Sequence, residues 1–177
     1  MQRGIAEGGN ETPRSRATLL FIARHGNLLL IRKKRGLGAG KINGPGGHIE
    51  PGETPLEAAV REVREEVGVT PRAPEERGNL RFQFADGLTM EVHVFYATDS
   101  VGDPVETDEA MPFWVPADAL PYDRMWADDR IWMPVFLAGK FFRGRFFFEG
   151  DRLQAHSLTV FETYASFAAA EMQGGAI

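Results

Sequence analysis

The segment from Gly47 to Val69 constrains this chain most, because it joins a glycine loop to a carboxylate-rich helix. It reads G-x5-E-x7-R-E-U-x-E-E-x-G-U, where U is aliphatic, and every fixed position is filled. Glu62 and Glu66 share one helix face, and Glu65 lies about 60 degrees further around the axis. Three such carboxylates suit a divalent metal that keeps coordination positions free for phosphate oxygens. The segment therefore predicts hydrolysis or transfer at phosphorus.

The sequence also predicts where this helix begins and ends. Thr54-Pro55-Leu56-Glu57 is a capping box with proline at the first helical position, and Gly68 predicts the helix end. Ahead of the helix, the backbone of Gly46 and Gly47 can approach closely and lend a carbonyl ligand to a metal. Helical spacing predicts one buried face, formed by Leu56, Ala59, Val60, Val63 and Val67.

Composition narrows the class of protein. The 177 residues indicate one domain with a real core, and 43% apolar and 25% charged residues are ordinary for a globular protein. A net charge of −5 argues against a nucleic-acid polymer as partner, and the absence of cysteine excludes disulfides and thiolate metal sites. No apolar run reaches membrane-spanning length, and no signal peptide opens the chain. We expect a cytoplasmic monomer that acts on a small anionic molecule, away from membranes.

The rest of the chain predicts strands around two or three helices. Residues 1–15 are polar and glycine-rich, so we expect a disordered leader or an expression remnant, followed by one domain over 16–172 and a frayed tail over 173–177. The whole pattern favours an α+β or α/β/α sandwich. The expected elements are a hairpin of 18–23 and 27–31, a functional loop over 32–47, strands over 80–84, 90–98 and 113–116, a helix over 129–137 despite Pro134, a closing hairpin of 141–148 and 153–158, and a terminal helix over 159–172.

The filled pattern of residues 47–69 is identified as the Nudix box, so the chain resembles the Nudix hydrolases. The resemblance implies the Nudix fold, an α/β/α sandwich with a mixed central sheet, and Mg²⁺ as cofactor with Mn²⁺ as a substitute. It also implies that Glu62, Glu65 and Glu66 are metal ligands and that one of them acts as base for the attacking water. Glu53 would support the loop, and Arg61 would orient the glutamates.

Several separated segments sharpen this resemblance. Together they are similar to the oxidized purine nucleoside triphosphatases, over about residues 18–160. The similarity implies hydrolysis of 8-oxo-dGTP and 2-hydroxy-dATP to a monophosphate and pyrophosphate, which sanitises the nucleotide pool. Leu37, Ile42, Pro45 and Ala127 depart from the group and could shift selectivity toward alkylated or ordinary purines. The segments are 33–47, 92–95, 105–112, 125–134 and 140–144.

A purine site needs a stacking surface and polar groups aimed at the base edge. Trp126 offers a ring face, while Asn43, Asp128 and Asp129 offer hydrogen bonds. Two adjacent carboxyls do not both ionise easily, so one pKa should rise, and a pair that exchanges a proton could read guanine-like and adenine-like edges. The structural alternatives are a helix cap for the aspartates, a core position for Trp126 and a turn for Asn43.

The resemblance places further side chains in or near the pocket. Glu109 aligns with an acidic residue that approaches the metal, although a surface charge is the alternative. Lys33 could contact phosphate, the pocket or only solvent. Other functions remain open at this stage: a pyrophosphatase for ADP-ribose or dinucleotides, or a binding module without catalysis. The remaining pocket positions, which could also be ordinary core or surface residues, are Thr18, Leu37, Phe82, Phe84 and Met90.

Overall fold

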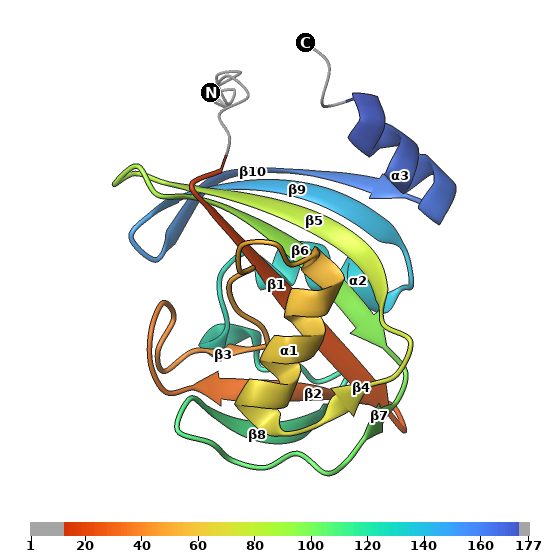
Figure 1. Cartoon of the computed structure of the whole chain (residues 1–177). Coiled ribbons are helices and arrows are strands. Elements are labelled where there is room, and N and C mark those ends of the chain that lie inside the picture. The colour runs from red at the N-terminus through yellow and green to blue at the C-terminus, as the bar shows by residue number, and fades with distance from the viewer. Residues whose placement is uncertain (1–12, 174–177) are drawn as a thin grey trace.

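The computed structural model describes residues 13–173 and shows a mixed β-sheet with helices packed on it (Figure 1). Its eight strands are β1 (Ser15–Arg24), β2 (Asn27–Lys33), β3 (Ile42–Asn43), β5 (Glu75–Phe84), β6 (Thr89–Ala97), β8 (Ala110–Pro116), β9 (Phe141–Glu149) and β10 (Arg152–Phe161). The order is β10-β9-β5-β6-β1-β2-β3, with β8 also paired to β2. Strand β1 runs parallel to β6, and β5 runs parallel to β9, so the predicted mixed sandwich is confirmed.

Helix α1 (Pro55–Val67) begins and ends where the sequence predicts. The Thr54 hydroxyl accepts the Glu57 N–H, and the Glu57 carboxylate accepts the Thr54 N–H in return, which satisfies two free donors at the helix start. Gly68 has a φ of 75° and closes the helix in the left-handed region. The predicted buried face is wrong at Leu56, which lies in the first turn, is 42% exposed and does not belong to the apolar core that contains Ala59 and Val63.

The two faces of the sheet carry separate apolar cores. Helix α1 covers one face over β1 and β2, and α2 (Asp129–Leu137) lies behind the sheet (Figure 1). Helix α2 has the predicted bounds and contains Pro134. The core beneath α1 includes Leu20, Ile22, Leu29, Ile31, Ala59, Val63 and Val67. The core beneath α2 includes Phe21, Leu80, Trp132, Met133, Phe136, Phe142 and Phe148.

Some predicted elements need correction. The first hairpin exists, but β1 pairs with β2 only at its end, through Ala23↔Leu28 and Arg24↔Asn27, and with β6 along most of its length. The terminal helix was predicted to begin at residue 159, yet β10 continues to Phe161 and α3 (Tyr164–Gln173) follows. The added β10 residues pair with β9, which overrides local helix propensity.

Four small elements were not predicted. Strand β3 lies inside the segment 32–47 that was predicted to be a loop, and it pairs with β2. Strands β4 (Thr70–Pro71) and β7 (Ser100–Val101) form a two-stranded sheet, and a short 3-10 helix covers Tyr122–Arg124. Strand β1 begins inside the predicted leader, whereas residues 1–12 and the tail residues 174–177 lie outside the described residues. Over residues 13–173, no helix is long and apolar enough to cross a membrane.

Candidate active site

The glycine loop between β3 and α1 lies along β1. The Thr18 N–H donates to the Gly47 carbonyl at 2.8 Å, and the Leu20 N–H donates to the Pro45 carbonyl at 2.8 Å. The Gly46 N–H donates to Glu66 Oε2 at 2.9 Å, which ties the loop to the last turn of α1. The Gly47 carbonyl accepts the hydrogen bond from Thr18 with one of its two lone pairs, so Gly46 and Gly47 both stay candidates as backbone ligands.

Gly47 provides the space in which the Glu62 carboxylate lies. A Cβ atom at residue 47 would stand 2.5 Å and 2.6 Å from the two Glu62 carboxylate oxygens, far closer than real side-chain contacts allow. Any larger residue would therefore displace Glu62 or the loop. The loop backbone thus lies against two of the three predicted metal ligands, Glu62 and Glu66.

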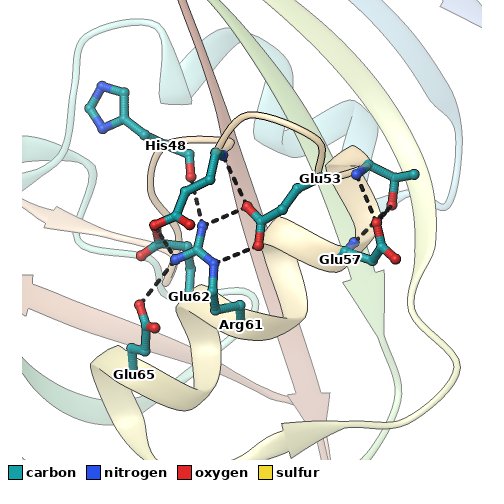
Figure 2. A network of polar contacts seen from close by, with 8 residues as sticks. His48, Glu53, Glu57, Arg61, Glu62 and Glu65 are labelled. Atoms are coloured by element: carbon teal, nitrogen blue, oxygen red, sulfur yellow. Dashed lines mark hydrogen bonds and ion pairs between the residues drawn. The ribbon is translucent and has the colours of Figure 1, made fainter.

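Arg61 is the centre of a polar network on the exposed side of α1 (Figure 2). Its Nη1 donates to Glu62 Oε1 and to Glu65 Oε2, both at 3.0 Å. Its Nε and Nη2 donate to the Glu53 carboxylate at 2.7 Å and 2.9 Å, and Nη2 also reaches the His48 carbonyl at 3.0 Å. One planar guanidinium therefore joins the loop to two predicted ligands, as expected for an orienting arginine.

The network sets different pKa values for neighbouring carboxyls. Hydrogen bonds from Arg61 lower the pKa of Glu53 to about 2, and Glu53 in turn accepts the Glu50 N–H, which holds the loop. Burial raises the pKa of Glu66 to about 7, and burial also raises the pKa of Glu62. The negative charge of Glu109 contributes to both increases, so Glu109 lies near the two glutamates.

The residues fit a divalent cation in their chemistry. Glu62, Glu65 and Glu66 offer carboxylate oxygens, the ligands that hard cations prefer, and the Gly46-Gly47 backbone leaves room beside two of them. Within residues 13–173, no three acidic or histidine side chains already converge on one point as a finished metal site. Arg61 holds Glu62 and Glu65, so ion binding would reorient these two carboxylates.

A cavity of about 130 Å³ adjoins the loop on the α2 side of the sheet. Gly44, Gly46 and Gly47 form part of its wall, so the same loop contacts both the cavity and the glutamate helix. All ten substrate-binding residues predicted from the sequence line it. They are Thr18, Lys33, Leu37, Asn43, Phe82, Phe84, Met90, Trp126, Asp128 and Asp129.

The two aspartates are buried at the start of α2, with side chains 2% and 3% exposed. Asp128 occupies the cap position, but its side chain makes no capping hydrogen bond; its Oδ2 accepts the Trp132 indole N–H at 3.0 Å. Asp129 Oδ2 accepts the Trp126 N–H at 3.0 Å. Burial raises the pKa of both carboxyls, and the Asp128 charge raises the pKa of Asp129 further. Asp128 therefore does not cap α2 through its side chain, and base reading by the two aspartates stays a prediction.

Two buried polar atoms on cavity-lining residues have no protein partner within residues 13–173. Among the described residues, the buried Asp128 Oδ1 and Thr18 Oγ1 have no hydrogen-bond partner, which is unusual unless a ligand or water supplies one. Asn43 Oδ1 accepts the Gly44 N–H at 2.8 Å, so the amide nitrogen is the Asn43 group left to donate. Three residue types thus offer hydrogen bonds to a base edge inside an apolar wall.

Lys33 and Glu109 connect the cavity with the metal helix. Lys33 lines the cavity, and its positive charge opposes the rise in the pKa of Glu66, so it lies within electrostatic reach of both regions. The Glu109 carboxylate pairs with Arg35, and the Glu109 N–H donates to Thr107 Oγ1 at 3.2 Å. Thr107 also donates to the Glu66 carbonyl at 2.8 Å, which fastens the Glu109 loop to α1.

Sequence reasoning missed several cavity residues. Trp132 was assigned to the core; it is fully buried, as expected, but it also lines the cavity and holds Asp128. Phe148 meets the Trp126 ring edge-on at 5.8 Å between centroids. The alternation of β5, β6 and β9 could have indicated part of the wall, because residues two apart share a sheet face. The other missed wall residues include Leu80 and Val92.

This sheet, glycine loop, carboxylate helix and purine-sized cavity define a hydrolase acting on phosphate anhydrides. The chain belongs to the Nudix family, since the NUDIX domain model matches residues 12–136. It is similar to the oxidized purine nucleoside triphosphate hydrolase of Danio rerio, with 44% identity over 80% of this chain and 92% of that protein. The protein of the same name from Mus musculus is 36% identical over 83% of this chain and 96% of that protein.

Solved structures agree with this placement. The mutator MutT protein of Bacillus halodurans superposes with a TM-score of 0.74 and 28% identity, covering 81% of this chain and 97% of that chain. A MutT Nudix hydrolase from Burkholderia pseudomallei gives a TM-score of 0.63 and 28% identity over 70% of this chain and 98% of that chain.

Proposed function

We propose that this chain hydrolyses oxidized purine nucleoside triphosphates to the monophosphate and pyrophosphate, with 8-oxo-dGTP and 2-hydroxy-dATP as substrates. The single observation that carries the proposal is the cavity that joins Asp128, Asp129 and Trp126 to the glycine loop of the Nudix box. Two relatives that this chain matches over more than nine-tenths of their length, with 92% and 96% covered, are named as oxidized purine nucleoside triphosphate hydrolases. Removal of such nucleotides protects DNA from damaged precursors.

The base would lie between the apolar wall and Trp126, with its edge toward the two aspartates. An aromatic ring offers stacking surface, and the unpartnered Asp128 Oδ1 and Thr18 Oγ1 supply sites for hydrogen bonds. The phosphate chain would then extend along Gly46 and Gly47 toward α1. Lys33 lies where its ammonium could neutralise phosphate oxygens near Glu66.

We assign the cation to Glu62, Glu65 and Glu66, with Glu109 and the carbonyl of Gly46 or Gly47 as further ligands, and we propose Mg²⁺ with Mn²⁺ as a substitute. Such a cation neutralises phosphate oxygens and lowers the pKa of a bound water. The chain's own contribution is orientation: Arg61 holds Glu62 and Glu65, while the Gly46 N–H holds Glu66. A neighbouring glutamate accepts the proton of the attacking water.

A kinetic panel tests this function. Wild-type protein is assayed at one Mg²⁺ concentration with 8-oxo-dGTP, 2-hydroxy-dATP, methylated purine triphosphates, dGTP and ADP-ribose, with pyrophosphate as the measured product. The proposal expects the highest kcat/KM for the two oxidized purines. A preference for ADP-ribose, or for ordinary dGTP over both oxidized purines, would overturn it.

Glu66→Gln tests the assigned metal ligand, since glutamine keeps the size of the glutamate side chain and removes its negative charge. The variant should lose turnover by about a thousandfold or more if the carboxylate binds the cation. Turnover equal to wild type would instead favour a site elsewhere on the chain.

We also propose a monomer, which size-exclusion chromatography with light scattering can check; the cytoplasmic location stays a prediction.

A further inference from the structure

Lys41 lies against the Trp126 ring and is not among the residues that line the cavity. Its ammonium nitrogen is 4.7 Å from the centroid of the Trp126 ring, within the range of a cation–π contact. Trp126 lines the cavity and Lys41 does not, so the ammonium occupies the ring face that a bound base would not use. The lysine side chain is 27% exposed, which limits competition from water.

An ion pair with the turn between β9 and β10 anchors the Lys41 ammonium. Lys41 Nζ is 3.2 Å from Asp151 Oδ2, and Asp151 lies in the turn between β9 and β10. The Lys41 N–H also donates to the Gly38 carbonyl at 2.9 Å. Gly38 is itself close to the indole, since a Cβ there would stand 3.1 Å from Trp126 Nε1. The loop at Gly38 and the Lys41 ammonium therefore both lie close to the Trp126 ring, and Asp151 of the hairpin turn holds the ammonium there.

The charge of Lys41 also reaches the buried aspartates. Burial and the Asp128 charge raise the pKa of Asp129, and the Lys41 charge opposes that rise. Tyr122 faces the same carboxyl, because Asp129 contributes to raising the pKa of the Tyr122 hydroxyl. Lys41 is thus the cation that acts on both the stacking ring and the edge-reading carboxyl.

We propose that Lys41 is a positioning residue for base recognition, which its Asp151 ion pair anchors and which holds the Trp126 ring from behind. A cation on one face also draws ring electron density toward itself, which favours an electron-rich purine on the other face. The inference rests on the proposed function. Its effect falls on base binding and leaves the phosphate chemistry on α1 unchanged.

Lys41→Met tests the proposal, because methionine keeps most of the unbranched side chain and removes the ammonium group and its charge. We expect KM for 8-oxo-dGTP to rise about threefold to tenfold while kcat changes less than about twofold. Lys41→Arg should restore most of the affinity, and Asp151→Asn should give a smaller increase in KM. Lys140→Met is the matched control, since Lys140 forms an exposed pair with Glu162 at 2.8 Å, outside the cavity wall.

A second readout separates positioning from simple loop stability. Metal-free protein is titrated with 8-oxo-dGMP, and binding is followed by tryptophan fluorescence. Lys41→Met should weaken binding about as much as it raises KM, and it should have no further effect in a Trp126→Phe background. The pH at which base preference changes should move upward, since Lys41 no longer opposes protonation of Asp129.

The outcomes distinguish this inference from the proposed function. If wild type does not hydrolyse purine triphosphates, the proposed function fails first. If wild type is active but Lys41→Met matches Lys140→Met in KM, 8-oxo-dGMP binding and pH profile, only the role of Lys41 is overturned. A loss confined to kcat would also overturn it.

Discussion

The Asp128 carboxylate accepts the Trp132 indole N–H at 3.0 Å, deep inside the protein. One oxygen of this carboxylate is thereby fixed by the α2 core, and the other has no partner among the described residues. The same tryptophan that packs the core therefore orients a carboxylate that lines the cavity. If Asp128 recognises the base as we propose, stability and substrate recognition depend on the same pair.

Base preference should depend on the aspartates. Because a carboxyl can donate or accept according to its protonation, Asp128→Asn and Asp129→Asn fix a donor where the wild type can choose. We expect at least one variant to change the ratio of kcat/KM for 8-oxo-dGTP and 2-hydroxy-dATP by about tenfold, and to flatten its pH dependence. The measurement is a pH series for both substrates. Two variants with the wild-type ratio at every pH would refute base reading.

Asp128 should also make the protein less stable as pH rises. Burial raises the pKa of Asp128 to about 6 from an ordinary value of 3.8. The folded state holds this proton more tightly than the unfolded state. The proton on Asp128 therefore stabilises the fold in full below about pH 4, and this stabilisation is lost as pH rises through about 6. Asp128→Asn should gain relative stability across that interval, by no more than about 3 kcal/mol.

Urea unfolding at pH 4 and pH 7 measures this difference. The exposed Asp118→Asn is the control, because its carboxylate is solvated and should show no comparable change. Equal pH dependence in wild type and Asp128→Asn would mean that the carboxyl is not buried as described.

Arg61 should support activity through the glutamates that it holds. Arg61→Gln removes its hydrogen bonds to Glu53, Glu62 and Glu65, and loss of such supporting contacts costs about 10-fold to 100-fold in activity or metal affinity. The pKa of Glu53, which Arg61 lowers to about 2, should return toward its ordinary value in an NMR titration. Arg64→Gln on the same helix is the control, and similar losses in both variants would contradict an orienting role.

Gly47→Ala should disturb the site without unfolding the domain. The added Cβ would enter the space of the Glu62 carboxylate, so we expect metal affinity and kcat/KM to fall by about 100-fold. A double-mutant cycle with Glu62→Gln measures the coupling, and the two losses should be strongly non-additive. Fully additive losses would show that Gly47 acts elsewhere. Circular dichroism checks that the fold is retained.

Local signals explain which elements the sequence could predict. The bounds of α1 follow from Thr54, Glu57 and Gly68, which act within one or two helical turns. Leu56 fits the apolar period equally well but is exposed, because the period predicts which face of a helix is apolar and not how much of that face the rest of the protein covers. The switch from β10 to α3 was missed for the same reason: pairing with β9 is a long-range interaction.

In the site, too, some residues can be predicted from the sequence and others depend on contacts between distant parts of the chain. A fixed spacing predicts the glutamates and Arg61, and the resemblance to a nucleotide-hydrolysing group adds the cavity residues. Neither the spacing nor the resemblance predicts that Lys41 lies over the Trp126 ring, because the two residues are 85 positions apart in the sequence (126 minus 41). Trp132 was assigned one role because a sequence cannot show that one ring serves the core and the cavity at once.

The parallel pairing of β1 with β6 has a consequence for synthesis on the ribosome. Thr18 lies opposite His93 in that register, so the first strand cannot find its neighbour until much of the chain has been made. Trp126 and the aspartates emerge later still. A nascent chain halted before Trp126 would carry the complete Nudix box and yet lack the three residues that we propose to recognise the base.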